Sequence, residues 1–257
     1  MSGQQASFGG GTAPAAAAQR AAGRTSFAVI LSLSFCHLLN DLMQSLVPAL
    51  YPILKTTYAL DFGQIGLITL AFQCTASLFQ PVVGMLTDRR PQPYSLAAGM
   101  GSTLLGLLLM AHAHSYPAIL GAAVLIGLGS AVFHPEASRV ARMAAGGRYG
   151  LAQSLFQVGG NVGTASGPLL AAFVVVPAGQ RSIAWFSAVA LLGMAVLFQV
   201  GRWYAAKRAE GAVARAKARA VAAAHGLPRR KVGIAIVALV LLLFSKNVYS
   251  ASLGSYY

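Results

Sequence analysis

Apolar residues fill long stretches of this chain, and short polar segments separate one stretch from the next. Six such stretches lie at 27–54, 63–86, 94–113, 117–139, 151–176 and 182–203, and a seventh runs from 232 to 257. A helix of about twenty residues is long enough to cross the hydrocarbon layer of a membrane, which is about 30 Å thick. The pattern therefore predicts an all-α membrane protein, with six membrane-spanning helices followed by part of a seventh.

Composition and the placement of charge support this interpretation. Hydrophobic residues make up 56% of the chain and charged residues only 9%, whereas roughly a quarter of the residues of an average soluble domain are charged. The formal net charge of +14 could indicate a nucleic-acid partner, but the Lys and Arg residues lie mostly between the apolar stretches. We therefore expect the lipid bilayer as a partner, and no nucleic acid.

The basic residues also predict an orientation. On alternate sides of the expected spans, only Lys55 and Arg181 lie on the side opposite the N-terminus, and Lys246 lies inside the seventh stretch. The other sixteen of the nineteen Lys and Arg residues share the side of the N-terminus. Because cytoplasmic loops are enriched in Lys and Arg, we predict a multi-pass membrane protein with a cytoplasmic N-terminus.

Composition divides the chain into four segments. Residues 1–24 are rich in Gly, Ala, Ser and Gln and predict a disordered tail. Residues 25–204 form the expected six-helix bundle, and 205–231, which are rich in Lys and Arg, predict a basic cytoplasmic linker. Residues 232–257 would then begin a second half with the seventh helix.

A polar stripe interrupts the first apolar stretch. The spacing of its four members places them on one helical face: His37, Asn40, Asp41 and Gln44. Ionisable groups inside a membrane are costly, and burial of Asp41 favours its protonated form unless a cation pairs with it. Asp41 could therefore carry a coupling proton, and its neighbours could contact a substrate. A packed polar contact between helices is the alternative.

The fourth stretch contains a proline next to ionisable residues. Pro135 could break the helix and start a new one, whose N-terminal N–H groups would face an anion. His134 would then lie near the substrate, and Glu136 could pair with Arg139, three residues later. The alternative is a simple kink, with the Arg139 side chain reaching the lipid headgroups.

Of two other groups of ionisable residues, one is a candidate for substrate binding and the other is not. Lys246 in the seventh stretch lies at a depth similar to that of His37, so we expect it to contact a negatively charged substrate, or Asp41 across the cavity. His112 and His114 lie in a short outer loop without a third ligand nearby, so we predict no metal site there. The sequence contains no catalytic motif, which argues against an enzyme, and it suggests no cofactor.

Two segments resemble motifs of the major facilitator superfamily. The segment after the second stretch resembles a cytoplasmic latch motif, with Pro91 where glycine is usual, and its candidate gating residues are Gly84, Asp88, Arg89 and Arg90. The fifth stretch resembles the antiporter motif of drug-exporting members, with candidate packing residues Gly159, Gly163, Gly167 and Pro168. Close helix packing by small residues explains the second motif equally well.

Longer strings are similar to the fosmidomycin resistance family within this superfamily. They lie at 79–82, 132–144 and 150–161. The resemblance implies a major facilitator fold with two six-helix halves, of which this chain would hold a truncated part: the first half, the linker and the start of helix seven. A second half or another copy of the chain would complete it.

The resemblance also implies a function. We expect a proton-coupled exporter of small anionic antibiotics such as phosphonates in a bacterial inner membrane, in which Asp41 or Glu136 carries the proton. The candidate substrate contacts are His37, Asn40, Gln44, His134, Arg139 and Lys246. The alternatives are a transporter of another small drug or organic anion, because fold does not fix substrate, and a truncated membrane protein that does not transport.

Overall fold

The structure, a computed structural model, describes residues 25–222 and, beyond them, 230, 233–234, 236–242 and 245. The chain forms two compact units, Met1–Ala206 and Lys207–Tyr257, and the first contains the helix bundle. The helices of the chain are α2 (Phe27–Ala49), α3 (Tyr51–Tyr58), α4 (Phe62–Arg89), α5 (Ser95–Ala111), α6 (Tyr116–Ala144), α7 (Tyr149–Leu170), α8 (Val176–Ala178) and α9 (Phe186–Ala222), of which α9 extends beyond the first unit. A π-helical turn, Ala171–Val175, precedes α8, and a 3₁₀ segment, Gln180–Trp185, precedes α9. The predicted tail at 1–24 and Lys246 lie outside the described residues.

The helices have the length and composition of membrane spans. Among the described residues, five helical segments are long and apolar enough to cross a membrane, and α5 is an apolar helix of 17 residues. Large apolar side chains such as Leu78 and Phe173 lie on the bundle surface. The predicted all-α membrane architecture with a six-helix bundle is therefore confirmed.

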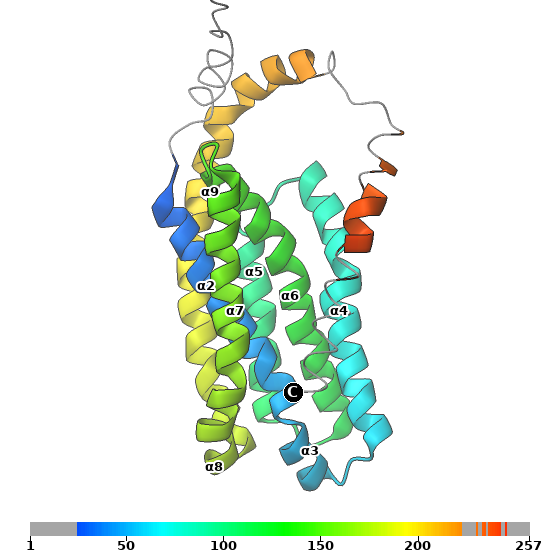
Figure 1. The fold of residues 1–257 in the computed structure, drawn as a ribbon. Helices are drawn as coiled ribbons and strands as arrows, with labels where there is room; N and C mark the ends of the chain where they lie inside the picture. The colour runs from blue at the N-terminus through cyan, green and yellow to red at the C-terminus, as the bar shows by residue number, and fades with distance from the viewer. Residues whose placement is uncertain (1–24, 223–229, 231–232, 235, 243–244, 246–257) are drawn as a thin grey trace, which may run out of the picture. The chain divides into compact units, whose positions relative to one another are not determined.

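Packing centres on two helices (Figure 1). The helix α6 contacts α2, α4, α5 and α7, and α2 packs along α7. Apolar side chains such as Leu33, Met43, Leu107, Ile126 and Leu197 fill the interior. This arrangement places the polar stripe of α2 between α6 and α7.

The first apolar stretch forms two helices instead of the single span expected at 27–54. The helix α2 ends at Ala49, and α3 begins at Tyr51 with Pro52 in its first turn. Proline has no N–H to donate to the carbonyl of Pro48, and its fixed φ suits the start of a helix. The apolar pattern alone carries no sign of this break.

The expected break at Pro135 is absent: α6 runs without interruption from Tyr116 to Ala144 and contains Pro135. The prediction of a restarted helix with free N–H groups was therefore wrong. A proline inside a membrane helix is tolerated where neighbouring helices and polar side chains satisfy the freed backbone groups. Here α6 is packed on several sides, and the anion-binding helix end that we predicted does not form.

The sixth span also differs from expectation at its end. The helix α9 does not stop near Trp203 but continues to Ala222, so the predicted linker begins inside a helix. Its continuation is rich in Ala, Lys and Arg, which are strong helix formers. Loss of apolar character marks where a segment leaves the membrane, and it does not mark where the helix ends.

Candidate functional site

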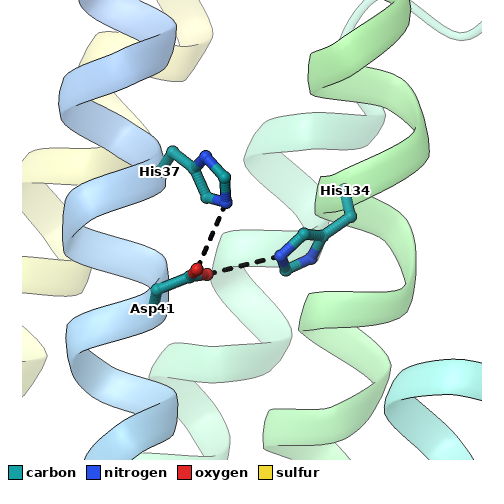
Figure 2. A group of neighbouring side chains, drawn as sticks. All are labelled: His37, Asp41 and His134. Atoms are coloured by element: carbon teal, nitrogen blue, oxygen red, sulfur yellow. Dashed lines mark ion pairs between the residues drawn. The ribbon is translucent and has the colours of Figure 1, made fainter. Parts of the chain in front are cut away.

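Asp41 lies between two histidines that come from different helices (Figure 2). Its Oδ2 is 3.2 Å from Nε2 of His37 on α2, and its Oδ1 is 3.4 Å from Nε2 of His134 on α6. The side chain of His37 is 2% exposed, that of Asp41 15% and that of His134 30%. We call these three residues the His–Asp cluster. Two features that the sequence presented separately, the stripe and the proline segment, thus meet at one carboxylate.

A backbone carbonyl fixes the ring of His37. Nδ1 of His37 is 2.8 Å from the carbonyl oxygen of Phe156 on α7, and since a carbonyl only accepts, Nδ1 donates. The His37 ring also stacks on the ring of Phe156, with centroids 4.0 Å apart. Gly160 leaves room for this ring, because a Cβ there would lie 2.5 Å from ring atoms of His37 and 2.9 Å from Oδ2 of Asp41.

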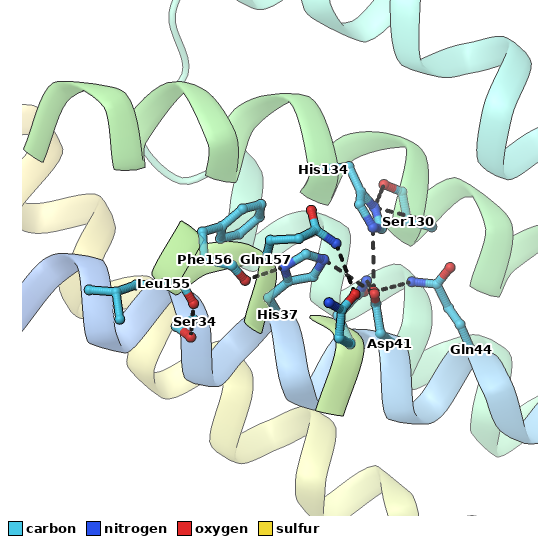
Figure 3. Close-up of polar contacts among 11 residues, drawn as sticks. Ser34, His37, Asp41, Gln44, Ser130, His134, Leu155, Phe156 and Gln157 are labelled. Atoms are coloured by element: carbon cyan, nitrogen blue, oxygen red, sulfur yellow. Dashed lines mark hydrogen bonds and ion pairs between the residues drawn. The ribbon is translucent and has the colours of Figure 1, made fainter. Parts of the chain in front are cut away.

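Ser130, on the same helix, orients His134. Its Nδ1 is 3.1 Å from the carbonyl oxygen of Ser130 and 3.2 Å from the Ser130 hydroxyl (Figure 3). A proton on Nδ1 satisfies the carbonyl and leaves Nε2 directed at Asp41. Both histidines therefore have one ring nitrogen close to a backbone carbonyl and the other close to the same carboxylate.

The contact between His37 and Asp41 needs an additional proton. Because Nδ1 of His37 already donates to Phe156, Nε2 of the neutral ring presents a lone pair to Oδ2 of Asp41, which is also an acceptor. The contact becomes a charge-assisted hydrogen bond only when a further proton resides on the ring or on the carboxyl group. The cluster can therefore hold or lose a proton, and loss of the proton weakens the contact between His37 and Asp41.

Two amides complete the polar stripe. Nδ2 of Asn40 donates to Oδ1 of Asp41 at 3.1 Å, and Nε2 of Gln44 approaches the same oxygen at 3.5 Å. The prediction that the stripe occupies one face of a helix is thus confirmed. Asn40 is buried, whereas Gln44 lies at the edge of a cavity.

A cavity of about 340 Å³ lies next to the His–Asp cluster. Small-molecule sites in proteins typically have volumes of about 300–1,000 Å³. Residues of four helices line the cavity: Asp41, Gln44, Ser45, Pro48, Phe72, Gln73, Ala76, Ser77, Gln80, Ser130, His134 and Thr164. Asp41 is the one carboxylate of this lining, and amides and hydroxyls supply most of its other polar groups.

Three polar residues of α4 line the cavity although we did not predict them as site residues. They are Gln73, Ser77 and Gln80, whose spacings of four and three place them on one helical face. The periodicity that identified the stripe on α2 is therefore present on α4 as well. It is a weaker signal, because none of the three residues is ionisable.

Glu136 and Arg139 form the predicted ion pair, but neither lines the cavity. Nη2 of Arg139 is 2.6 Å from Oε2 of Glu136, whose side chain is 1% exposed. Nη1 of Arg139 donates to the carbonyl of Thr87 at 3.2 Å, and its guanidinium lies 5.3 Å from the ring centroid of Tyr204. Ser95 contacts the same carboxylate oxygen at 3.4 Å. The pair thus joins α4, α5, α6 and α9, and Arg139 is held by these contacts instead of extending alone to headgroups.

The His–Asp cluster is also the one group among the described residues whose geometry could hold a metal ion. One ligand atom from each of its three members lies within 4.8 Å of the others. We did not expect a metal site from the sequence, in which His37 and His134 are almost a hundred positions apart. The histidines that we considered for that role, His112 and His114, are exposed and outside this group.

Comparison with known proteins identifies the family. The sequence profile of the Major Facilitator Superfamily matches residues 33–256. The chain belongs to the Major Facilitator Superfamily. Together with its apolar helices, this assignment indicates a multi-pass membrane protein of a transporter family.

Two bacterial relatives refine the assignment. The chain is 53% identical over 242 residues to the fosmidomycin resistance protein of Escherichia coli (strain K12), and the aligned region covers 94% of this chain and 59% of that protein. It is 46% identical over 185 residues to the uncharacterized MFS-type transporter YfnC of Bacillus subtilis (strain 168), and the aligned region covers 72% of this chain and 45% of that protein. The chain thus spans about half the length of these relatives, and the predicted resemblance is confirmed.

A solved structure supports the fold. The crystal structure of tetrameric PepTSo2 aligns with a TM-score of 0.58 and 17% identity, over 84% of this chain and 47% of that chain. At this identity the similarity concerns the arrangement of helices only. It agrees with the helix bundle described above.

The two predicted superfamily motifs differ in what the structure shows. A Cβ on Gly159, Gly163 or Gly167 of α7 would collide with backbone or side-chain atoms of α2, so these glycines do allow the close packing we predicted. Pro168 lies inside α7, three residues before the π-helical turn. The close seam explains how Ser34 of α2 donates to the carbonyl of Leu155, at 2.6 Å.

The latch segment makes fewer contacts. Asp88, Arg89 and Arg90 are exposed at the end of α4, and none of the ion pairs among the described residues includes them. A Cβ on Gly84 would lie 4.0 Å from Cβ of Pro135, an ordinary contact that does not require glycine. The gating role of these residues stays a prediction.

Proposed function

We propose that this chain takes part in proton-coupled export of a small anionic antibiotic of the phosphonate type across a bacterial inner membrane. The observation that carries the proposal is the cavity wall in which the one lining carboxylate, Asp41, is held between two histidines. The relative that is 53% identical and named fosmidomycin resistance protein supports the substrate class. The N-terminus would face the cytoplasm.

Asp41 is the proposed proton carrier. The contact between His37 and Asp41 is a hydrogen bond only in the presence of an additional proton, so gain and loss of that proton change how firmly α2 holds its neighbours. A change of this kind at the wall of a cavity is suited to couple a proton gradient to rocking of the two halves of a transporter. Lipid around the bundle prevents the charge from being solvated elsewhere.

The cavity lining suits an oxyanion. The amides of Gln44, Gln73 and Gln80 and the hydroxyls of Ser77 and Thr164 are hydrogen-bond donors that carry no negative charge. The negative charge of Asp41 is offset when an additional proton resides on one of its histidine partners or on the carboxyl group itself. We propose that these donors bind the substrate, whereas His37 and Asn40 support Asp41.

Arg139 and Lys246 remain proposed substrate contacts, and Glu136 remains a proposed proton acceptor. In the described structure the charge of Arg139 is engaged by Glu136, so a substrate could use it only when that pair opens. Such an opening would also free Glu136 to accept a proton. Arg139→Gln should then weaken export of a phosphonate more than export of a neutral compound, and equal losses would assign Arg139 a structural role.

The decisive experiment measures fosmidomycin susceptibility of an export-deficient bacterium that expresses the 257-residue chain, with an empty vector for reference. Asp41→Asn removes the proton-binding group, and Asp61→Asn is the matched control. Asp61 caps α4 and is not among the residues that line the cavity, and Asn preserves the cap. We expect resistance from the unchanged chain and from Asp61→Asn, and none from Asp41→Asn.

Two results would contradict the proposal. Susceptibility equal to that of the empty vector, with the chain shown to be folded in the membrane, would mean that this chain does not export the compound. Full resistance from Asp41→Asn would remove Asp41 from the mechanism.

A parallel assay of downhill exchange in vesicles should show activity for Asp41→Asn, because exchange without a gradient needs no proton. A panel of other small organic anions tests the substrate class.

A further inference from the structure

We propose that the His–Asp cluster is a binding site for a divalent transition-metal ion of the zinc type. Two imidazoles and a carboxylate from two helices converge there. The inference goes beyond the proposed export function, since it concerns binding of an ion that the export mechanism does not use.

The first argument concerns the ligand atoms. Nε2 of His37 and Nε2 of His134 both face the carboxylate of Asp41, at 3.2 and 3.4 Å. In a tetrahedral site with metal–ligand bonds of about 2.0–2.1 Å, neighbouring ligand atoms are about 3.3 Å apart. Both histidine–carboxylate separations are therefore close to the edge of such a tetrahedron. The two histidines face different oxygens of this carboxylate, and one ligand atom from each of the three residues lies within 4.8 Å of the others. Small rotations of the three side chains would bring one such set of atoms onto a shared ion.

The second argument concerns the orientation of the imidazoles. A histidine that ligates a metal through one nitrogen usually donates its other N–H to a carbonyl or carboxylate, which fixes the ring. Nδ1 of His37 does so to the carbonyl of Phe156, at 2.8 Å, and Nδ1 of His134 lies 3.1 Å from the carbonyl of Ser130. Both Nε2 lone pairs are thereby directed at the place where an ion would sit.

The third argument concerns charge and surroundings. Without a proton or a metal ion, the lone pair on Nε2 of His37 faces an acceptor oxygen of Asp41, and a cation between them removes this conflict. The amides of Asn40 and Gln44 donate to Asp41, which supports a ligating carboxylate. The ring of Phe156 shields one side of the cluster from water.

Ligand chemistry selects the metal. Imidazole nitrogens suit Zn²⁺, Co²⁺, Ni²⁺ and Cu²⁺, whereas Mg²⁺ and Ca²⁺ prefer oxygen ligands. Three protein ligands leave at least one coordination position for water or for an anion. Asp41 and His134 line the cavity, so that position would be accessible from it. A bound ion would tie α2 to α6 and compete with the proton proposed for Asp41.

The test uses the purified 257-residue chain in lipid nanodiscs, with Co²⁺ as a spectroscopic probe and Zn²⁺ as competitor. We expect one Co²⁺ per chain, visible absorption bands of a four- or five-coordinate ion, and loss of these bands when Zn²⁺ but not Mg²⁺ is added. His134→Gln should lower the affinity at least tenfold. The double variant His112→Gln, His114→Gln removes two exposed histidines and should bind as the unchanged chain does.

Gly160→Ala provides a second variant that keeps all three ligands. Its Cβ would displace the ring of His37, so we expect at least a tenfold loss of Co²⁺ affinity. Circular dichroism and thermal melts of each variant verify that the bundle is folded. Equal affinity of the unchanged chain and folded His134→Gln, affinity lost instead in the double variant, or no visible bands at all would overturn the proposal. None of these outcomes depends on export activity.

Discussion

The packing of α2 on α7 leads to a sharp prediction about Gly163. A Cβ on Gly163 would collide with the backbone of Leu38, whose carbonyl carbon and Cα would each be 3.0 Å away. Backbone atoms of a helix cannot rotate aside as a side-chain end can. Gly163→Ala should therefore push α2 away from α7 along its length.

The size of the effect follows from what the displacement breaks. Overpacking costs about 1–3 kcal/mol, and the hydrogen bonds from Ser34 to Leu155 and from His37 to Phe156 contribute about 1 kcal/mol each. Alanine gains about 1 kcal/mol over glycine as a helix former. The free energy of unfolding should therefore fall by about 2–4 kcal/mol in total.

Gly66→Ala is the matched control. Gly66 also lies inside a helix, α4, but a Cβ there would have nothing within 4 Å. Only the propensity gain remains, so Gly66→Ala should leave stability unchanged or raise it by up to about 1 kcal/mol. Unfolding in mixed micelles with increasing SDS, followed by circular dichroism, measures both variants. If Gly163→Ala proves as stable as Gly66→Ala, the close seam between α2 and α7 is not what the structure describes.

Three further predictions concern stability and use the same unfolding assay. Asp61→Ala removes the capping box that Asp61 forms with Gln64 and should cost about 1 kcal/mol, whereas equal losses for Ala and Asn would refute the capping role. Glu136→Gln leaves the charge of Arg139 without its partner and should cost about 3 kcal/mol, and a second change of Arg139 to Gln should recover part of it. Tyr58→Phe removes a hydroxyl that bonds to Ala113, after α5, and to Gln180, before α9, and should lower the free energy of unfolding by about 1 kcal/mol. A much smaller loss would show that these bonds contribute little.

The candidate site was predictable only in part. Helical periodicity placed Asp41 and His37 on one face, and that face is confirmed. The partner on α6 was named as a candidate for a different reason, because Pro135 was expected to break the helix. Periodicity acts within one helix, so it cannot tell which side chain of another helix approaches Asp41. The polar face of α4 was overlooked although its spacing is equally regular.

The sequence by itself determined which segments are helices in the membrane and to which family the chain belongs. Segment length and apolar character identify the spanning helices locally, because the bilayer requires every spanning segment to satisfy its own backbone hydrogen bonds. Specific strings of residues identify the family. Only the tertiary structure decided which helix faces meet. Lipid is as apolar as the protein interior, so apolar patterns do not distinguish inward from outward faces. The contacts of Asp41 with His134, and the room that Gly160 leaves for His37, therefore arise from packing between helices that are distant in sequence.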